Sequence, residues 1–178
     1  MPVTRPALYS HASLPRPKVP IAMPTAIRTA TVKDITAIEA IVQAAYSPYI
    51  QRIGRSPGPM LDDYCQHVDA GVIQVFESAR QVVGFVVLIG KEGYLLLDNL
   101  AVSPAAQGLG YGRQLLAFAE AQAISAGYRE MRLYTNEAMT ENIELYKRRG
   151  FVETHRAVEN GLHRVYMKKD LMPNKQHP

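Results

Sequence analysis

The sequence predicts an α/β fold of the mixed α+β kind, with about seven strands and about four helices in one domain. Three observations predict it. Short segments rich in β-branched and aromatic residues recur along the chain, longer segments carry apolar residues at helical spacing, and glycine, proline or asparagine stands between them. The predicted order is β-α-α-β-β-β-α-β-α-β-β, without an internal repeat.

The first three elements lie between residues 25 and 71. Ala26–Ala30 is predicted as a short strand, and Thr31 with Asp34 resembles a capping box at the start of the first helix. That helix carries apolar residues at helical spacing and is expected to end at Pro48. After a loop over 52–59, the second helix is expected to place four residues on one apolar face: Leu61, Tyr64, Cys65 and Val68. Cys65 is therefore interpreted as a buried structural cysteine.

The remaining elements follow from alternation, helical spacing and turn residues. Strands are predicted over 72–77, 82–89, 94–102, 131–135, 151–158 and 162–168, and helices over 108–126 and 139–149. Gly127 and Gly150 stand where the two helices are expected to end. Asn160-Gly161 predicts a tight hairpin between the last two strands.

The composition indicates one globular domain with two tails. The 178 residues are 47% hydrophobic and 20% charged, and no apolar run is long enough for a membrane span. Residues 1–24 are rich in proline and free of acidic residues, which predicts a flexible tail, and 172–178 is predicted as a second tail after a domain over 25–171. A cytoplasmic protein is the default expectation for a sequence without a signal-peptide pattern.

The net charge of +4 does not predict nucleic-acid binding. All 16 acidic residues lie between Asp34 and Asp170, whereas four of the 20 basic residues lie in the tails, so the segment 25–171 is formally neutral. No stripe of lysine and arginine follows a predicted helix face. Cys65 is the single cysteine and the five histidines lack metal-ligand spacing, so neither a disulfide nor a metal site is predicted.

A glycine-rich turn between a predicted strand and a predicted helix is the most informative segment. It runs from Gln107 to Arg113, with glycine at 108, 110 and 112. Glycines allow several backbone N–H groups to converge, and a helix N-terminus adds positive charge, so the turn predicts a pyrophosphate site. Arg113 stands where a dinucleotide fingerprint has its third glycine, and the Gly-Lys-Ser/Thr tripeptide of a Walker A loop does not occur.

The same turn carries a family resemblance. Gln107-x-x-Gly110-x-Gly112 resembles the Q/R-x-x-G-x-G/A motif with which the GNAT superfamily grips the pyrophosphate of coenzyme A. Leu100-Ala101-Val102, Thr135-Asn136 and Leu145-Tyr146-x-x-x-Gly150-Phe151 resemble further segments of that family. The resemblance covers about residues 25–171. It implies an acetyl-CoA-dependent N-acetyltransferase with a splayed, mixed but mostly antiparallel sheet of about seven strands.

The resemblance also assigns a site for acetyl-CoA, the cosubstrate. The expected contacts come from the central strand, the glycine-rich turn and the following strand and helix: Leu100, Ala101, Val102, Gln107, Gly108, Leu109, Gly110, Tyr111, Gly112, Arg113, Asn136, Asn142 and Tyr146. Beside a bulge in the central strand, pantetheine is expected to take main-chain hydrogen bonds. The amide of Leu100 is expected to stabilise charge on the thioester oxygen.

Two further residues are candidates for proton transfer. Tyr146 occupies the family position of the acid that protonates the departing thiolate, and a core tyrosine is the structural alternative. Asp98 is the candidate base for the arriving amine, since alternation predicts that Leu96, Asp98 and Leu100 share one face. A substrate-binding carboxylate and a solvated strand residue are the alternatives for Asp98.

The loop between the first two helices supplies the candidate acceptor residues: Tyr46, Tyr49, Arg52 and Arg55. The two arginines suit a carboxylate or a phosphate through paired hydrogen bonds, with surface solvation as the alternative. The expected acceptor is therefore the primary amine of a small, amino acid-like molecule. A peptide or protein acceptor and a non-catalytic coenzyme A-binding module stay open, and the resemblance allows a homodimer.

Overall fold

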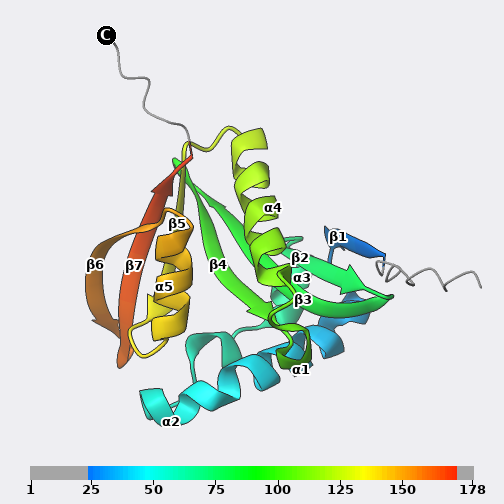
Figure 1. Ribbon diagram of the computed structural model, residues 1–178, viewed down its shortest axis with the longest axis horizontal. Coiled ribbons are helices and arrows are strands. Elements are labelled where there is room, and N and C mark those ends of the chain that lie inside the picture. The colour runs from blue at the N-terminus through cyan, green and yellow to red at the C-terminus, as the bar shows by residue number, and fades with distance from the viewer. Residues whose placement is uncertain (1–23, 172–178) are drawn as a thin grey trace, which may run out of the picture.

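A computed structural model describes residues 24–171, and the residues 1–23 and 172–178 of the predicted tails lie outside the described part. Seven strands form one sheet in the order β1-β2-β3-β4-β5-β7-β6 (Figure 1). Their bounds are β1 Thr25–Thr29, β2 Ile73–Ser78, β3 Gln81–Lys91, β4 Tyr94–Val102, β5 Glu130–Asn136, β6 Val152–Glu159 and β7 Leu162–Asp170. All neighbouring strands are antiparallel except β4 and β5. The predicted mixed, mostly antiparallel sheet is confirmed.

Helices cover both faces of the sheet. They are α1 Ile35–Tyr46, α2 Ile50–Ile53, α3 Tyr64–Asp69, α4 Tyr111–Ser125 and α5 Thr140–Arg148. One core, which includes Ile38 and Val68, lies under α1 and α3, and a second core, which includes Leu115 and Ile143, lies under α4 and α5 (Figure 1). In the part of the chain that the structure describes, no helix has the length and apolar character needed to cross a bilayer.

The first helix begins as predicted but is followed by further helical turns. Thr31 N–H donates to Asp34 Oδ2 at 2.8 Å, and Asp34 N–H donates to Thr31 O at 2.9 Å, which starts a 3-10 turn over Val32–Asp34 before α1. Pro48 does not end the helical path, because it stands early in a second 3-10 turn, Ser47–Tyr49, that leads into α2. Proline is tolerated there because an N–H in a first helical turn has no intrahelical acceptor.

The prediction of a buried Cys65 is wrong, because the second predicted helix is shorter than expected. α3 begins only at Tyr64, after its N-cap Asp63, so Leu61 lies outside the helix and is exposed. Tyr64 and Val68 form the buried face of α3. Cys65 is one residue removed from that face and is exposed to solvent.

A bulge interrupts β4 at Asp98. On β3, Val87 pairs with Asn99, and the next residue, Leu88, pairs with Leu97. Asp98 is therefore an extra residue on β4 without a partner on β3, which is the arrangement of a β-bulge. The bulge that the family resemblance implied in the central strand is present.

The bulge overturns the prediction that Leu96, Asp98 and Leu100 share one face of β4. Leu97 before the bulge and Leu100 after it both belong to the core under α4 and α5, so side-chain alternation changes phase between them. Asp98 turns instead towards Tyr134 of β5, which donates a hydrogen bond to it. Asp98 and Leu100 thus lie on opposite faces of the strand.

β4 and β5 are paired over a short stretch and then separate. Only Leu95–Leu97 on β4 pair with Met131–Leu133 on β5. Beyond Leu97, β4 stays paired with β3 as far as Val102, whereas β5 stays paired with β7 as far as Asn136. The two strands diverge in Figure 1, as the family resemblance implied.

Candidate active site

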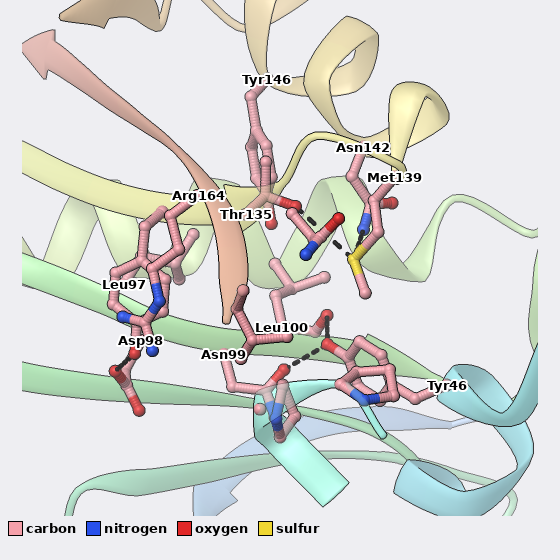
Figure 2. Close-up of a pocket in the computed structure, with 16 residues that line it drawn as sticks. Tyr46, Leu97, Asp98, Asn99, Leu100, Thr135, Met139, Asn142, Tyr146 and Arg164 are labelled. Carbon is pink, nitrogen blue, oxygen red and sulfur yellow. Dashed lines mark hydrogen bonds between the residues drawn. The ribbon is translucent and has the colours of Figure 1, made fainter. Parts of the chain in front are cut away.

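Two pockets adjoin β4 where it separates from β5. The loop pocket, of about 370 Å³, is lined by Ala45, Tyr46, Leu100, Ala101, Val102, Ala106, Gln107, Gly108, Gly110, Tyr111, Gly112, Arg113, Asn142 and Leu145. The bulge pocket, of about 60 Å³, is lined by Tyr46, Pro57, Gly58, Pro59, Leu97, Asp98, Asn99, Leu100, Tyr134, Thr135, Asn136, Met139, Asn142, Tyr146, Leu162 and Arg164 (Figure 2). Both include Tyr46, Leu100 and Asn142, so the two pockets meet at these residues.

One wall of the loop pocket presents backbone N–H groups. Gly108 and Gly110 have φ values of +79° and +81°, which glycine adopts without strain, and they lead the chain into α4 at Tyr111. The first N–H groups of a helix have no intrahelical acceptor. Within residues 24–171, no N–H group from Gly108 to Arg113 has an acceptor. Free donors therefore remain at the positive end of α4.

Two side chains of the turn hold the loop in place. Gln107 Nε2 donates to Val102 O at 3.2 Å. The ring of Tyr111 stacks on Phe76 with centroids 4.6 Å apart, and its hydroxyl lies 3.1 Å from Ser78 Oγ. The side chain of Tyr111 is thus directed to β2, and its N–H remains the group that a ligand in the loop pocket would meet.

The loop pocket fits an anionic group such as the diphosphate of coenzyme A. Arg113 is exposed and lines it, and no acidic side chain of the described residues does. Leu109 is 62% exposed and lines neither pocket, so a contact from this residue would have to come from its main chain.

Leu100 and Val102 present main-chain groups to the space between β4 and β5. Leu100 O lies 3.4 Å from Tyr46 Oη, and Val102 O accepts a hydrogen bond from Gln107 Nε2, so both carbonyls point away from β3. In a strand the N–H and C=O of one residue point to the same side, so the two N–H groups also face away from β3. Ala101, between them, belongs to the core under α1 and α3.

Tyr146 belongs to the core under α5 and also lines the bulge pocket. Only 8% of the residue is exposed, and its ring meets Phe151 edge-on with centroids 5.7 Å apart. Burial raises the pKa of the Tyr146 hydroxyl to about 12. Among residues 24–171 this hydroxyl has no hydrogen-bond partner, so its proton is free for a molecule in the pocket.

A buried hydrogen-bond network, which the sequence analysis missed, holds β4 beside the bulge. Tyr46 Oη donates to Asn99 Oδ1 at 2.5 Å, Asn99 Nδ2 donates to Tyr64 Oη at 3.0 Å, and Tyr64 Oη donates to Pro59 O at 2.7 Å. Desolvation is the main reason that the pKa values of Tyr46 and Tyr64 are raised, so both hydroxyls stay protonated. The network joins the end of α1 and the start of α3 to β4, as Figure 2 shows for Tyr46.

A second cluster lies at the other side of the bulge. Tyr134 Oη donates to Asp98 Oδ1 at 2.6 Å, and Arg164 Cζ lies 4.2 Å from the centroid of the Tyr134 ring. Desolvation and then the bond to Asp98 raise the pKa of Tyr134, so its hydroxyl remains a donor. Figure 2 places Asp98 and Arg164 at the same end of the bulge pocket.

The predicted acceptor residues divide between the pocket and its surroundings. Tyr46 lines both pockets, whereas three lie outside them: Tyr49, Arg52 and Arg55. Arg52 Nη1 lies 2.7 Å from Glu141 Oε1 at the start of α5. Arg55 Nη1 donates to Asn160 O in the β6–β7 turn at 2.6 Å. Both arginines therefore connect the segment between α1 and α3 to the C-terminal half of the chain.

The two predicted asparagine contacts also lie at the pockets. Asn142 lines both, and Asn136 lines the bulge pocket. Asn136 Oδ1 accepts from Ala138 N–H at 2.9 Å, which fixes the turn between β5 and α5. Their predicted contacts with pantetheine stay predictions.

Sequence reasoning missed Asn99, Tyr134 and Arg164 as pocket residues. Asn99 is a polar residue in a predicted strand that is otherwise mostly apolar, and this signal was available in the sequence. The structure shows that Asn99 is buried, with 4% exposed. For Arg164, the decisive fact is its position opposite Asn136 in the β5–β7 ladder. That pairing joins residues far apart in the chain, and no local pattern encodes it.

The comparisons with known proteins agree with this geometry. Residues 69–153 match the family model described as the acetyltransferase (GNAT) domain, and this span includes the bulge of β4, the glycine-rich turn and Tyr146. Over this segment the chain is similar to GNAT acetyltransferases. The chain is 39% identical over 89 residues to mycothiol acetyltransferase of Jonesia denitrificans, a match over 49% of this chain and 28% of the relative. The chain thus covers less than a third of that relative's length.

Solved structures share the fold of this chain. The paia N-acetyltransferase of Thermoplasma acidophilum, solved with coenzyme A, superposes with a TM-score of 0.71 at 16% identity, over 83% of this chain and 99% of the other. The ribosomal-protein-S18-alanine N-acetyltransferase of Escherichia coli gives a TM-score of 0.65 at 17% identity, over 86% and 99%. At these identities the likeness establishes the fold.

Proposed function

We propose that this chain transfers the acetyl group of acetyl-CoA to the primary amine of a small molecule. The observation that carries the proposal is the meeting of the loop pocket and the bulge pocket at Leu100, on the edge of β4 that β5 leaves free. A diphosphate at Gly108–Arg113 and pantetheine along Leu100–Val102 would bring the thioester to the bulge pocket. The neighbour solved with coenzyme A supports this cosubstrate.

Three groups around the bulge pocket suit direct transfer. Leu100 N–H is the donor for the reacting carbonyl oxygen, and one such donor contributes about 10²–10³ in rate. Asp98 is the acceptor for a proton of the amine, and Tyr146 is the donor for the sulfur. The amine nitrogen forms a bond to the carbonyl carbon while the carbon–sulfur bond breaks, so one proton leaves nitrogen and one reaches sulfur.

The raised pKa of Tyr146 defines how it would act. A pKa of about 12 keeps the hydroxyl protonated throughout the range in which amines become neutral. It also exceeds the pKa of about 8.5 that is usual for a thiol, so complete transfer to a free thiolate would be unfavourable. Tyr146 therefore donates a hydrogen bond to the sulfur as negative charge develops on it, and net protonation of the departing thiolate is completed by solvent.

Contacts around the bulge pocket support a small acceptor. The bond from Arg55 to Asn160 O joins the segment before α3 to the β6–β7 hairpin. Gly58 lies against Leu162 on the same hairpin, since a Cβ added at Gly58 would lie 3.9 Å from Leu162 Cδ1. An extended peptide would have to pass these contacts.

The names of the relatives point to two different kinds of acceptor. The curated relative is named for mycothiol and not for a protein, which supports a small acceptor. The Escherichia coli neighbour is named for a ribosomal protein, and a peptide N-terminus is therefore the alternative acceptor. The cytoplasmic location and the homodimer stay predictions.

Calorimetry with coenzyme A and acetyl-CoA, followed by thiol release with a panel of amines and peptides, tests the proposal. We expect binding of both nucleotides, and one thiol released for each acetylated small amine found by mass spectrometry. Failure to bind either nucleotide would contradict the cosubstrate site. Binding without any acetylation would favour a non-catalytic module, and acetylation of peptide N-termini alone would favour the alternative acceptor.

A further inference from the structure

The bulge pocket holds two charged side chains of opposite sign. Asp98 comes from the bulge of β4 and Arg164 from β7, and the other residues that line this pocket carry no formal charge at neutral pH. Tyr134 contacts both, because its hydroxyl donates to Asp98 Oδ1 and its ring lies under the Arg164 guanidinium. Asp98 and Arg164 thus contact the same tyrosine and, among the described residues, form no ion pair with each other.

Asp98 keeps one carboxylate oxygen free. Its Oδ1 accepts the hydrogen bond from Tyr134, while its Oδ2 has no partner among residues 24–171. A carboxylate with a single hydrogen bond retains several acceptor positions. This oxygen is therefore available to an amine or ammonium group in the pocket.

The Arg164 side chain is held in one orientation but keeps hydrogen-bond donors free. Its side chain is 21% exposed, its Nη1 lies 3.3 Å from Glu159 Oε2, and its plane is supported by Tyr134. Glu159 is 45% exposed at the end of β6, so this contact lies at the solvent side of the guanidinium. A guanidinium has five N–H donors, and the remaining ones can form a paired hydrogen bond with a carboxylate.

The arginines that the sequence suggested for this role have other partners. Arg52 pairs with Glu141 and Arg55 donates to Asn160 O, and neither lines the bulge pocket. Arg164 is the basic side chain that lines it. Its position opposite Asn136 on β5 adds an amide side chain beside it.

We propose that the acceptor carries a carboxylate near its amine, with Arg164 as the residue that binds the carboxylate and Asp98 as the residue that faces the amine. The inference rests on the proposed acetyltransferase function and narrows its substrates to amino acid-type amines. Tyr134 is a positioning residue in this arrangement, since it contacts both charged groups. Opposite charges held at fixed separation select a molecule with both groups over one with the amine alone.

Matched acceptors test the selection. The panel consists of L-alanine, L-leucine and L-tyrosine, each with its decarboxylated amine and its amino acid amide. The amide is the stricter comparison, because its amine is less basic and more of it is neutral at a given pH. We expect kcat/KM for the best amino acid to exceed that for both of its analogues at least tenfold.

The variant Arg164→Gln tests the residue. Loss of a hydrogen-bonded charge should raise KM for the amino acid about 10- to 100-fold, and this factor should exceed the one for its decarboxylated amine at least tenfold. Arg164→Lys keeps the charge without the planar fork and should recover part of the loss. Arg132→Gln is the matched control, because Arg132 also lies over a tyrosine, 4.1 Å from the Tyr94 centroid, but outside the bulge pocket.

The outcomes separate the two proposals. Equal or better turnover of the decarboxylated amines, or an equal loss for both acceptor types in Arg164→Gln, would overturn the carboxylate inference and leave the acetyltransferase proposal standing. Nucleotide binding without thiol release for any amine would overturn both. A loss confined to carboxylate-bearing acceptors, absent in Arg132→Gln, would support the inference and cannot come from general destabilisation, which circular dichroism would report separately.

Discussion

The loop pocket and the bulge pocket meet at Leu100 but are built from different groups. The loop pocket takes its free N–H groups and its one guanidinium from a continuous segment, Gly108–Arg113, and mostly apolar side chains of other elements line the rest. The bulge pocket collects side chains from α1, β4, β5, α5, β7 and the segment before α3. A backbone site depends on where glycine permits the chain to turn, whereas a side-chain site depends on individual residues brought together by the fold. Substitutions should therefore affect the two pockets separately.

The largest expected effect is on the chemical step in the bulge pocket. Tyr146→Phe should lower kcat about 100-fold, and at least tenfold, because it removes the proton donor while it keeps the buried ring. The KM for acetyl-CoA should change little, since Tyr146 does not line the loop pocket. Steady-state thiol release measures both values.

Tyr128→Phe is the control for this variant. Tyr128 packs against the same core but lines neither pocket, so its kcat should match that of the wild type. An unchanged kcat in Tyr146→Phe would remove this residue as the acid and leave it a core tyrosine.

Substitutions in the loop pocket should change the affinity for coenzyme A. Gly110→Ala forces a side chain into a backbone with φ of +81°, so the turn should shift and the Kd for coenzyme A should rise about tenfold. Gly93→Ala has the same backbone demand, with φ of +84°, in the β3–β4 turn. Calorimetry should show normal affinity for Gly93→Ala, and equal affinities in the two variants would contradict the backbone site.

Substitution of Tyr46, which lines both pockets, should have a smaller effect on activity and should mainly lower stability. Tyr46→Phe removes the donor to Asn99 Oδ1 and leaves a buried acceptor without that bond, so the free energy of unfolding should fall by about 1–2 kcal/mol. We expect kcat/KM to fall about threefold to tenfold as the edge of β4 loosens. Tyr49→Phe is the control in urea unfolding, because Tyr49 is half-exposed and lines neither pocket.

The smallest effect on either pocket is expected from substitution of Asp34, which lines neither of them. Asp34 is 6% exposed and accepts from Arg28 Nη1 at 2.8 Å and Nη2 at 2.9 Å. Arg28 is the main reason that the pKa of Asp34 lies well below its ordinary range. Asp34→Asn should lower the free energy of unfolding by about 2 kcal/mol at pH 7, a moderate value because the Arg28 side chain is 40% exposed.

The pH dependence of this difference follows from the depressed pKa. The stabilisation is fully present above the ordinary aspartate pKa of about 4 and is lost as the pH falls from there towards the folded value. Urea unfolding at pH 7 and at pH 3 should therefore show a smaller gap between Asp34→Asn and the wild type at the lower pH. A gap that does not change would indicate loss of packing instead, and kcat should stay within twofold in either case.

The glycine-rich turn of the loop pocket was predictable from the sequence because its information is local. A strand, a turn with glycine at set positions and a helix start are neighbours in the chain, and the structure places Gly108 and Gly110 in the conformation that glycine favours. Asn160-Gly161 was equally predictable as a hairpin, and both residues have positive φ there. Such features depend on backbone preferences of a few consecutive residues.

The bulge pocket was less predictable because its information is distributed. Alternation counted along β4 failed at Asp98, since a bulge is set by pairing with β3 and not by the composition of β4. Arg164 reaches the pocket through the register of β5 and β7. Cys65 was misplaced because only Tyr64 and Val68, four residues apart, face the core from the short helix α3, and Cys65 lies beside that face.

The bulge at Asp98 adds a position to β4 without changing which of the other residues face each layer of helices. Before it, odd-numbered residues such as Leu97 serve the core under α4 and α5, and after it the odd-numbered Ala101 serves the core under α1 and α3. Deleting Asp98 would place Asn99 directly after Leu97 in a regular ladder with β3, and every residue from Asn99 onward would keep its present face. The extra position can therefore carry a polar side chain at the pocket while both cores keep the residues that they have now.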